Sequence, residues 1–218
     1  MKPTSTLTLV ALFAGASVTQ AATTLIAGDT GDGNFEASAS GSALDASGHW
    51  VQNGSNPIIQ EAVWAAETGD KGAWIRGWVA NLDGNFHQDE TVSAGGQYVL
   101  DAGFKLESNF KSNGGTVGMA LIWLDGTATE ISRVTVDVSS LASDSNWHHY
   151  DTSTVTAPAG TLQARAFFYY ATDDNIENGS QASAFVDNVS LVAVPEPSSA
   201  ALLGLGGAAL LMRRRKSF

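Results

Sequence analysis

Residues 97–106 read Gln-Tyr-Val-Leu-Asp-Ala-Gly-Phe-Lys-Leu, and this stretch decides the fold class. Its side chains alternate between apolar and polar, which is the pattern of a β-strand with one buried face. Asp101 and Lys105 are expected to face solvent. The face predicted to enter the core carries Tyr98, Leu100, Ala102, Phe104 and Leu106.

Similar stretches, rich in β-branched and aromatic residues, recur between glycine, Asn-Gly and Asp-Gly turn signals. The clearest others are 73–80, 116–124, 131–138, 162–171 and 184–192. In the stretch 162–171, alternation assigns to the core Leu162, Ala164, Ala166, Phe168 and Tyr170. No helical segment of useful length lies between these stretches. We therefore expect an all-β protein, an antiparallel β-sandwich of the jelly-roll type.

Composition excludes several classes of function. The chain has 218 residues, a formal net charge of −11 and no cysteine. A thiolate nucleophile, a disulfide framework and a zinc–thiolate site are therefore excluded. All 22 acidic residues lie between Asp29 and Glu196, where only six basic residues occur. Such an acidic body would repel phosphates, so nucleic acid is not an expected partner.

The N-terminal residues 1–22 have the pattern of a secretory signal peptide. Lys2 provides the positive start, and a short apolar run follows at 7–15. Thr19 and Ala21 have the spacing of a cleavage site, so we expect cleavage near residue 21 or 22. The alternative is an anchored first helix, although this run is too short to span a bilayer.

The C-terminal residues 195–218 follow a predicted body domain at 23–194. The segment consists of Pro195, Glu196 and Pro197, a 15-residue apolar run, and a basic cluster of Arg213, Arg214, Arg215 and Lys216. As a helix the run would measure about 22 Å at about 1.5 Å per residue, which is shorter than the roughly 30 Å hydrocarbon core. The basic cluster would hold the end of the chain in the cytoplasm. This pattern predicts a marginal transmembrane helix.

This order of Pro-Glu-Pro, short apolar helix and basic cluster resembles the PEP-CTERM sorting signal of Gram-negative bacteria. The resemblance implies a protein exported through the inner membrane and processed by an exosortase-type membrane protease near Pro195–Pro197. The membrane would be contacted only transiently, through the C-terminal helix. The body would reach the cell envelope or the extracellular space, in association with exopolysaccharide or biofilm. The alternative is an uncleaved tail anchor.

Two predicted strands carry aromatic and basic side chains on the face opposite the core. They are Trp74, Arg76 and Trp78 on one strand, and Arg165, Phe167 and Tyr169 on the other. Exposed aromatic surface of this kind marks an interaction site. Flat rings beside hydrogen-bonding groups suit sugars, so we interpret the six residues as a carbohydrate-binding platform. The alternative is that a loop covers these rings and makes them part of the core.

Several short motifs in fixed order resemble the galactose-binding-like jelly roll of carbohydrate-binding modules, near families 4, 9 and 22. The motifs are 32–36, 86–88, 92–100, 120–126, 147–150, 155–160 and 185–191. The resemblance implies a structural calcium ion, with Glu36 and Asp187 in the positions of the carboxylate ligands and backbone carbonyls near 33–34. Calcium accepts such mixed oxygen ligands. The alternative is weak binding or an empty site.

Catalysis is not expected from the motifs present. No His-Glu-x-x-His, Gly-x-Ser-x-Gly or P-loop pattern occurs, and His148 and His149 are adjacent, so they point to opposite faces of a strand. We therefore interpret the chain as a non-catalytic, exported protein that binds carbohydrate or sits in a polysaccharide matrix. The alternatives are a structural surface protein without a specific ligand and a small glycan-active enzyme.

Overall fold

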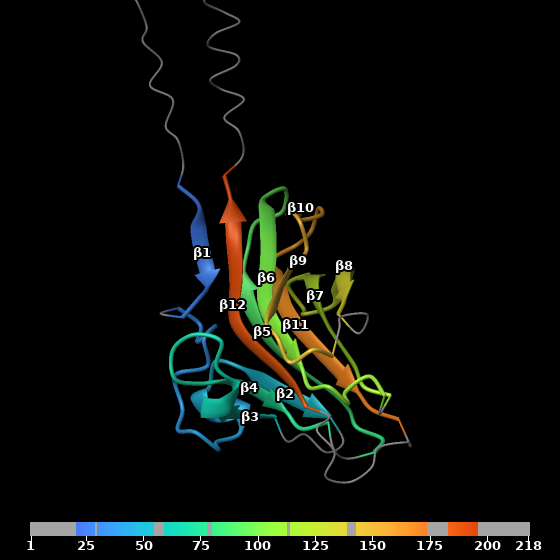
Figure 1. Ribbon diagram of the computed structural model, residues 1–218. Coiled ribbons are helices and arrows are strands. Elements are labelled where there is room, and N and C mark those ends of the chain that lie inside the picture. Colours follow the sequence, from blue (N-terminus) through green and yellow to red (C-terminus); the bar gives the residue numbers. More distant parts are fainter. Residues whose placement is uncertain are drawn as a thin grey trace, which may run out of the picture. The chain divides into compact units, whose positions relative to one another are not determined.

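The computed structural model describes residues 21–28, 30–54, 59–77, 80–112, 114–138, 143–173 and 183–195. Residues Ala22–Val194 form one compact unit. Two antiparallel sheets build this unit, which confirms the predicted all-β sandwich (Figure 1).

The elements are short, and the two 3-10 turns are the only helical elements of the described residues. In chain order they are β1 (Thr23–Ile26), η1 (Leu44–Ser47), β2 (Val51–Gly54), β3 (Ile59–Ala62), η2 (Val63–Ala65), β4 (Gly72–Ile75), β5 (Asp83–Thr91), β6 (Gln97–Leu106), β7 (Thr116–Leu124), β8 (Glu130–Asp137), β9 (His148–Asp151), β10 (Val155–Thr156), β11 (Gln163–Ala171) and β12 (Ala184–Val194).

The first sheet has seven strands, in the order β10-β6-β12-β4-β3, with β1 paired to β12 and β9 paired to β6. The second has five strands, in the order β2-β5-β11-β7-β8. Strand β12 is central to the first sheet and β11 is central to the second. The first and the last described strands lie side by side, with Thr23 opposite Ala193 (Figure 1).

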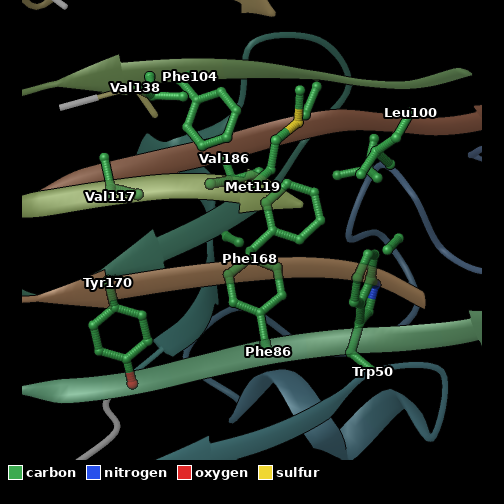
Figure 2. Packing of buried hydrophobic residues seen from close by; sticks show 14 of the residues in the cluster. Trp50, Phe86, Leu100, Phe104, Val117, Met119, Val138, Phe168, Tyr170 and Val186 are labelled. Atoms are coloured by element: carbon green, nitrogen blue, oxygen red, sulfur yellow. The ribbon is translucent and has the colours of Figure 1, made fainter. Parts of the chain in front are cut away.

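The core between the sheets is aromatic at its centre. Phe86 of β5 and Phe168 of β11 stack with ring centroids 4.8 Å apart, and Trp50 meets both rings edge-on. Phe104 of the seven-stranded sheet lies 6.1 Å from Phe168, so this ring group joins the two sheets (Figure 2). Stacked and edge-on pairs add about 0.5–1.5 kcal/mol each beyond the area they bury.

The alternation in 97–106 is confirmed, because Tyr98, Leu100 and the other three predicted core residues of β6 are all buried. The predicted strand 116–124 coincides with β7. Leu162 was assigned to the core, and this is wrong: it precedes β11 and is 55% exposed. Its apolar side chain continues the alternation of β11 to the position just before the strand begins.

The predicted signal peptide, the C-terminal helix, Trp78 and most of the sorting segment lie outside the described residues. Within the described part of the chain, no helix is long and apolar enough to cross a membrane.

The alternation of inward and outward side chains along β11 leads to the first prediction. Phe168→Ala should lower the free energy of unfolding by about 3–5 kcal/mol, because it leaves a cavity between the sheets. Phe167→Ala, one residue away on the outer side, should cost only about 1–2 kcal/mol. Urea unfolding of both variants measures the difference. Equal losses would mean that Phe167 is also a core residue, which would contradict the assignment of its face.

Candidate functional site

The structure separates five of the six residues that were interpreted as one platform; the sixth, Trp78, lies outside the described residues. Trp74 lies on β4 of the seven-stranded sheet, and Arg76 is the first residue after this strand. Arg165, Phe167 and Tyr169 lie on β11 of the five-stranded sheet. Both groups point away from the core, so they lie on opposite outer faces of the sandwich. A single platform containing both groups is therefore wrong, because the strand order places β4 and β11 in different sheets.

On the seven-stranded sheet, the aromatic side chains interact mainly with their own neighbours. The Trp74 ring nitrogen donates a hydrogen bond to Ser183 Oγ at 2.9 Å. The Arg76 guanidinium lies 5.0 Å from the centroid of the Trp74 ring, and Lys105 Nζ lies 4.8 Å from that of Trp147. Cation–π contacts of this kind stabilise the surface locally. These contacts account for the rings and cations of this face as local packing.

On the five-stranded sheet, polar residues of β5 stand directly opposite the outward residues of β11. Three cross-strand pairs form this set, which we call the β5–β11 face: Asn85 with Tyr169, His87 with Phe167, and Asp89 with Arg165. Successive pairs are two residues apart and therefore about 6.6 Å apart along the strands. Each of the first two pairs combines a ring with a hydrogen-bonding side chain.

Arg165 and Asp89 form the third pair, which is held by two hydrogen bonds. Arg165 Nε donates to Asp89 Oδ1 at 2.7 Å, and its Nη2 donates to Oδ2 at 2.8 Å. These bonds raise the pKa of Arg165 above its usual value. The bidentate geometry fixes both side chains and neutralises both charges at this end of the face.

His87 occupies the middle of the face and is only 8% exposed. Within the described residues, its Nδ1 atom is buried and has no hydrogen-bond partner. Burial lowers the pKa of His87, and the nearby Arg165 charge lowers it further, against the opposing effect of Asp89. The ring is therefore neutral at pH 7. Leaving a buried nitrogen unpaired costs about 1–3 kcal/mol, so an ordered water or a ligand hydroxyl would bind favourably here.

The rings of β11 rest on small and aliphatic residues of β7. Phe167 packs on Ala120, Ile122 and Leu124, all nearly fully buried although they point away from the core. A side chain at Gly118 would collide with the Tyr169 hydroxyl, because an added Cβ would lie within 2.3 Å of that oxygen. Glycine at this position lets the Tyr169 ring approach the sheet closely. The β11 rings thus lie on a rigid base while staying half-exposed.

The sequence analysis assigned no site role to β5, although the motif 86–88 lies within this strand. Residues 83–91 read Asp-Gly-Asn-Phe-His-Gln-Asp-Glu-Thr, which contains a turn signal and one large apolar residue. Phe86 is the core residue of this strand, so His87 must point outward. A polar strand with a single buried ring gives a weak periodic signal. The clue in the sequence to an outward polar group was His87, directly after Phe86.

The predicted calcium ligands both bind the loop 67–71. Asp187 Oδ2 accepts hydrogen bonds from the backbone N–H of Glu67 at 2.7 Å and of Thr68 at 3.2 Å. Glu36 Oε1 accepts from the backbone N–H of Asp70 at 2.6 Å and of Lys71 at 2.8 Å. The two carboxylates therefore hold one loop from its two ends.

This arrangement does not fit a calcium ion at Glu36 and Asp187. Both carboxylates face peptide N–H groups, which repel a cation, and Asp187 Oδ1 also accepts from the N–H of Asn188. Burial raises the pKa of Asp187 to about 6, although these hydrogen bonds oppose the rise. The described residues include no group of three or more Asp, Glu or His side chains placed to hold a metal ion.

A second histidine lies near this loop. His149 of β9 has Nδ1 at 3.1 Å from Asp101 Oδ1, and Nε2 at 3.0 Å from Glu67 Oε2. Partial burial would lower the pKa of His149, but the hydrogen bond to Asp101 and the charges of both carboxylates outweigh it and raise the pKa. The two histidines His87 and His149 are therefore shifted in opposite directions.

The comparisons with known proteins agree with two of the sequence interpretations, the sorting signal and the β-sandwich fold. Residues 193–216 match the family model described as the PEP-CTERM protein-sorting motif, as the resemblance predicted. The chain therefore carries this sorting motif at its C-terminal end. A search of the curated proteins finds no match.

Solved structures similar to this chain share little sequence identity with it. The enzymatically active domain of tailspike protein 4 from bacteriophage CBA120 is 12% identical with a TM-score of 0.51; the match covers 66% of this chain and 19% of that one. A carbohydrate-binding module of family 16 is 17% identical with a TM-score of 0.45, covering 62% and 86%. A xylan-binding domain of family 22 from Paenibacillus barcinonensis is 11% identical with a TM-score of 0.49, covering 81% and 98%. The chain spans about a fifth of the tailspike domain.

The opposite shifts of the two histidines can be measured in one experiment. In an NMR titration, His87 should titrate below the ordinary histidine value of about 6.5, and His149 should titrate above it. Asp101→Asn should lower the midpoint of His149 and leave that of His87 unchanged. If His87 titrated at or above His149, the burial of His87 in the β5–β11 face would be contradicted.

Proposed function

We propose that the protein is a non-catalytic, exported carbohydrate-binding protein and that the β5–β11 face holds the sugar. The observation that carries this proposal is the buried, unpartnered Nδ1 of His87 beside the half-exposed ring of Phe167. The His87 nitrogen offers a hydrogen bond, and the Phe167 ring offers an apolar surface. Sugars present both features, since a rim of hydroxyls surrounds their C–H faces.

The shape of the face supports an extended ligand. Two rings, Phe167 and Tyr169, lie two residues apart on one strand, with polar partners opposite each. Val51 of β2 is 49% exposed and stands opposite His87 on the other side of β5. Apolar side chains of β2 and β11 therefore flank the polar residues of β5, and this width suits a short run of sugar units better than a single monosaccharide.

The charges of the face favour a neutral glycan. Arg165 is paired with Asp89, and Arg133 of β8 is paired with Glu130. His87 is neutral at pH 7 because burial lowers its pKa. No cation in this set is left to attract a carboxylate of the ligand, while neutral hydroxyls can still donate to His87 and accept from it.

The sorting motif supports export as the second half of the proposal. A PEP-CTERM signal at 193–216 implies processing by an exosortase-type membrane protease in a Gram-negative-type bacterium. The body would then be released or attached at the cell envelope, where a glycan-binding face would place it in an extracellular polysaccharide matrix. Its transient membrane contact would be made by the C-terminal segment.

The test is glycan binding by residues 22–194, which contain both sheets and their shared core. We expect selective retention of a neutral polysaccharide on a glycan array. Tyr169→Ala and Phe167→Ala should each weaken binding by at least about tenfold, as loss of a stacking aromatic does at hot spots. His87→Ala should weaken it by a similar factor, while the far-ultraviolet CD spectrum stays unchanged.

Trp64→Ala is the matched control, because Trp64 is 54% exposed but belongs to the seven-stranded side of the sandwich. Its binding should equal that of the wild type. Loss of binding in this control, with none in Tyr169→Ala, would move the site to the opposite face. A folded domain that retains no glycan would favour a structural surface protein, and cleavage of the glycan would favour a small glycan-active enzyme.

A further inference from the structure

A single ammonium group joins three segments near the start of the chain. Lys71 lies just before β4, and its Nζ donates hydrogen bonds to the backbone carbonyl oxygens of Glu36, at 2.8 Å, and of Ser38. The same Nζ lies 3.5 Å from Glu61 Oε2 of β3 and 3.9 Å from Glu36 Oε2. Four oxygen atoms, two from carbonyls and two from carboxylates, therefore surround one positive charge.

The cluster is buried, so this charge is needed. The side chain of Glu61 is fully buried and that of Lys71 is 12% exposed. Burial raises the pKa of Glu61, and the nearby Asp32 charge adds to the rise, while the Ser38 N–H and Lys71 oppose it. Removing one partner of a buried ion pair leaves an uncompensated charge, which is strongly destabilising.

Two carboxylate oxygens of this region have no hydrogen-bond partner among the described residues: Asp32 Oδ2 and Glu61 Oε1. Asp32 is 4% exposed and Glu61 is 0% exposed. Asp32 also holds the segment that Lys71 binds, because its Oδ1 accepts from the N–H groups of Glu36 and Ala37. Without Lys71, the Glu61 carboxylate would feel the Asp32 charge with no ammonium to oppose it.

Mixed carbonyl and carboxylate oxygens at a junction of chain segments are the ligands that calcium prefers. We infer that the ammonium of Lys71 takes the place of a metal ion at this junction, and that the sandwich is therefore stable without calcium. The inference does not depend on the proposed carbohydrate function. It explains why Glu36, which was predicted as a calcium ligand, lies within reach of Lys71 and receives backbone N–H groups.

Thermal denaturation of residues 22–194 in calcium chloride and in EGTA tests this inference. The wild type should melt at the same temperature in both. Lys71→Ala should melt about 5–15 °C lower in EGTA, given the cost of breaking a buried pair and about 2–4 °C per kcal/mol for a domain of this size. Calcium should restore at least about 3 °C of that loss, because it fills the vacated oxygen cage.

Lys111→Ala is the matched control, because Lys111 is exposed and makes no ion pair within the described residues; its melting temperature should not change in either buffer. If Lys71→Ala does not fold in EGTA, calcium should recover its folded CD spectrum. The double variant Glu61→Gln with Lys71→Ala should lose the response to calcium. Stabilisation of the wild type by calcium, or no response of Lys71→Ala to calcium, would overturn the inference.

Discussion

Strand β11 lies between β5 and β7, and its two-residue period assigns every second ring to a different task. Phe168 and Tyr170 point inward, where Phe168 stacks on Phe86 and joins the two sheets. Phe167 and Tyr169 point outward onto the base formed by β7. Because the inward rings are closely packed, the strand cannot shift by one residue without moving its whole apolar set to the other face. The positions of the outward rings therefore follow from the core.

Strand β12 has the same central position in the other sheet. It pairs with β6 along its length, with β4 near its start and with β1 near its end. Asp187 lies within it and holds the loop 67–71, so the strand also orders the segment that carries Lys71. The PEP-CTERM motif begins at residue 193, before this strand ends. The sorting signal thus starts inside the last element of the sandwich, beside β1.

The sequence predicts the long, strongly alternating strands well, and β6 and β7 have the predicted bounds. It predicts much less of the site. Alternation gives the outward face of the β11 rings correctly, but it assigned no site role to His87 because β5 has one large apolar residue. Trp74 and Tyr169 were assigned to one platform because alternation gives the face of a strand and not its sheet. Strand order depends on long-range pairing, which a single sequence with several similar strands does not encode locally.

The two outer faces of the sandwich both carry rings and cations, and on each face a cation lies over a ring, as Arg133 lies over Phe167 on the five-stranded sheet. Around Trp74, the indole donates to Ser183, and Arg76 and Lys105 lie over rings. On the β5–β11 face, the charged groups are paired, yet a buried nitrogen of His87 has no partner within the described residues. A folded protein keeps a buried polar group unpaired only at a cost, so an ordered water or a ligand hydroxyl would bind favourably to such a group. The proposed sugar site therefore rests on the His87 nitrogen and its place beside Phe167, and not on the number of aromatic residues.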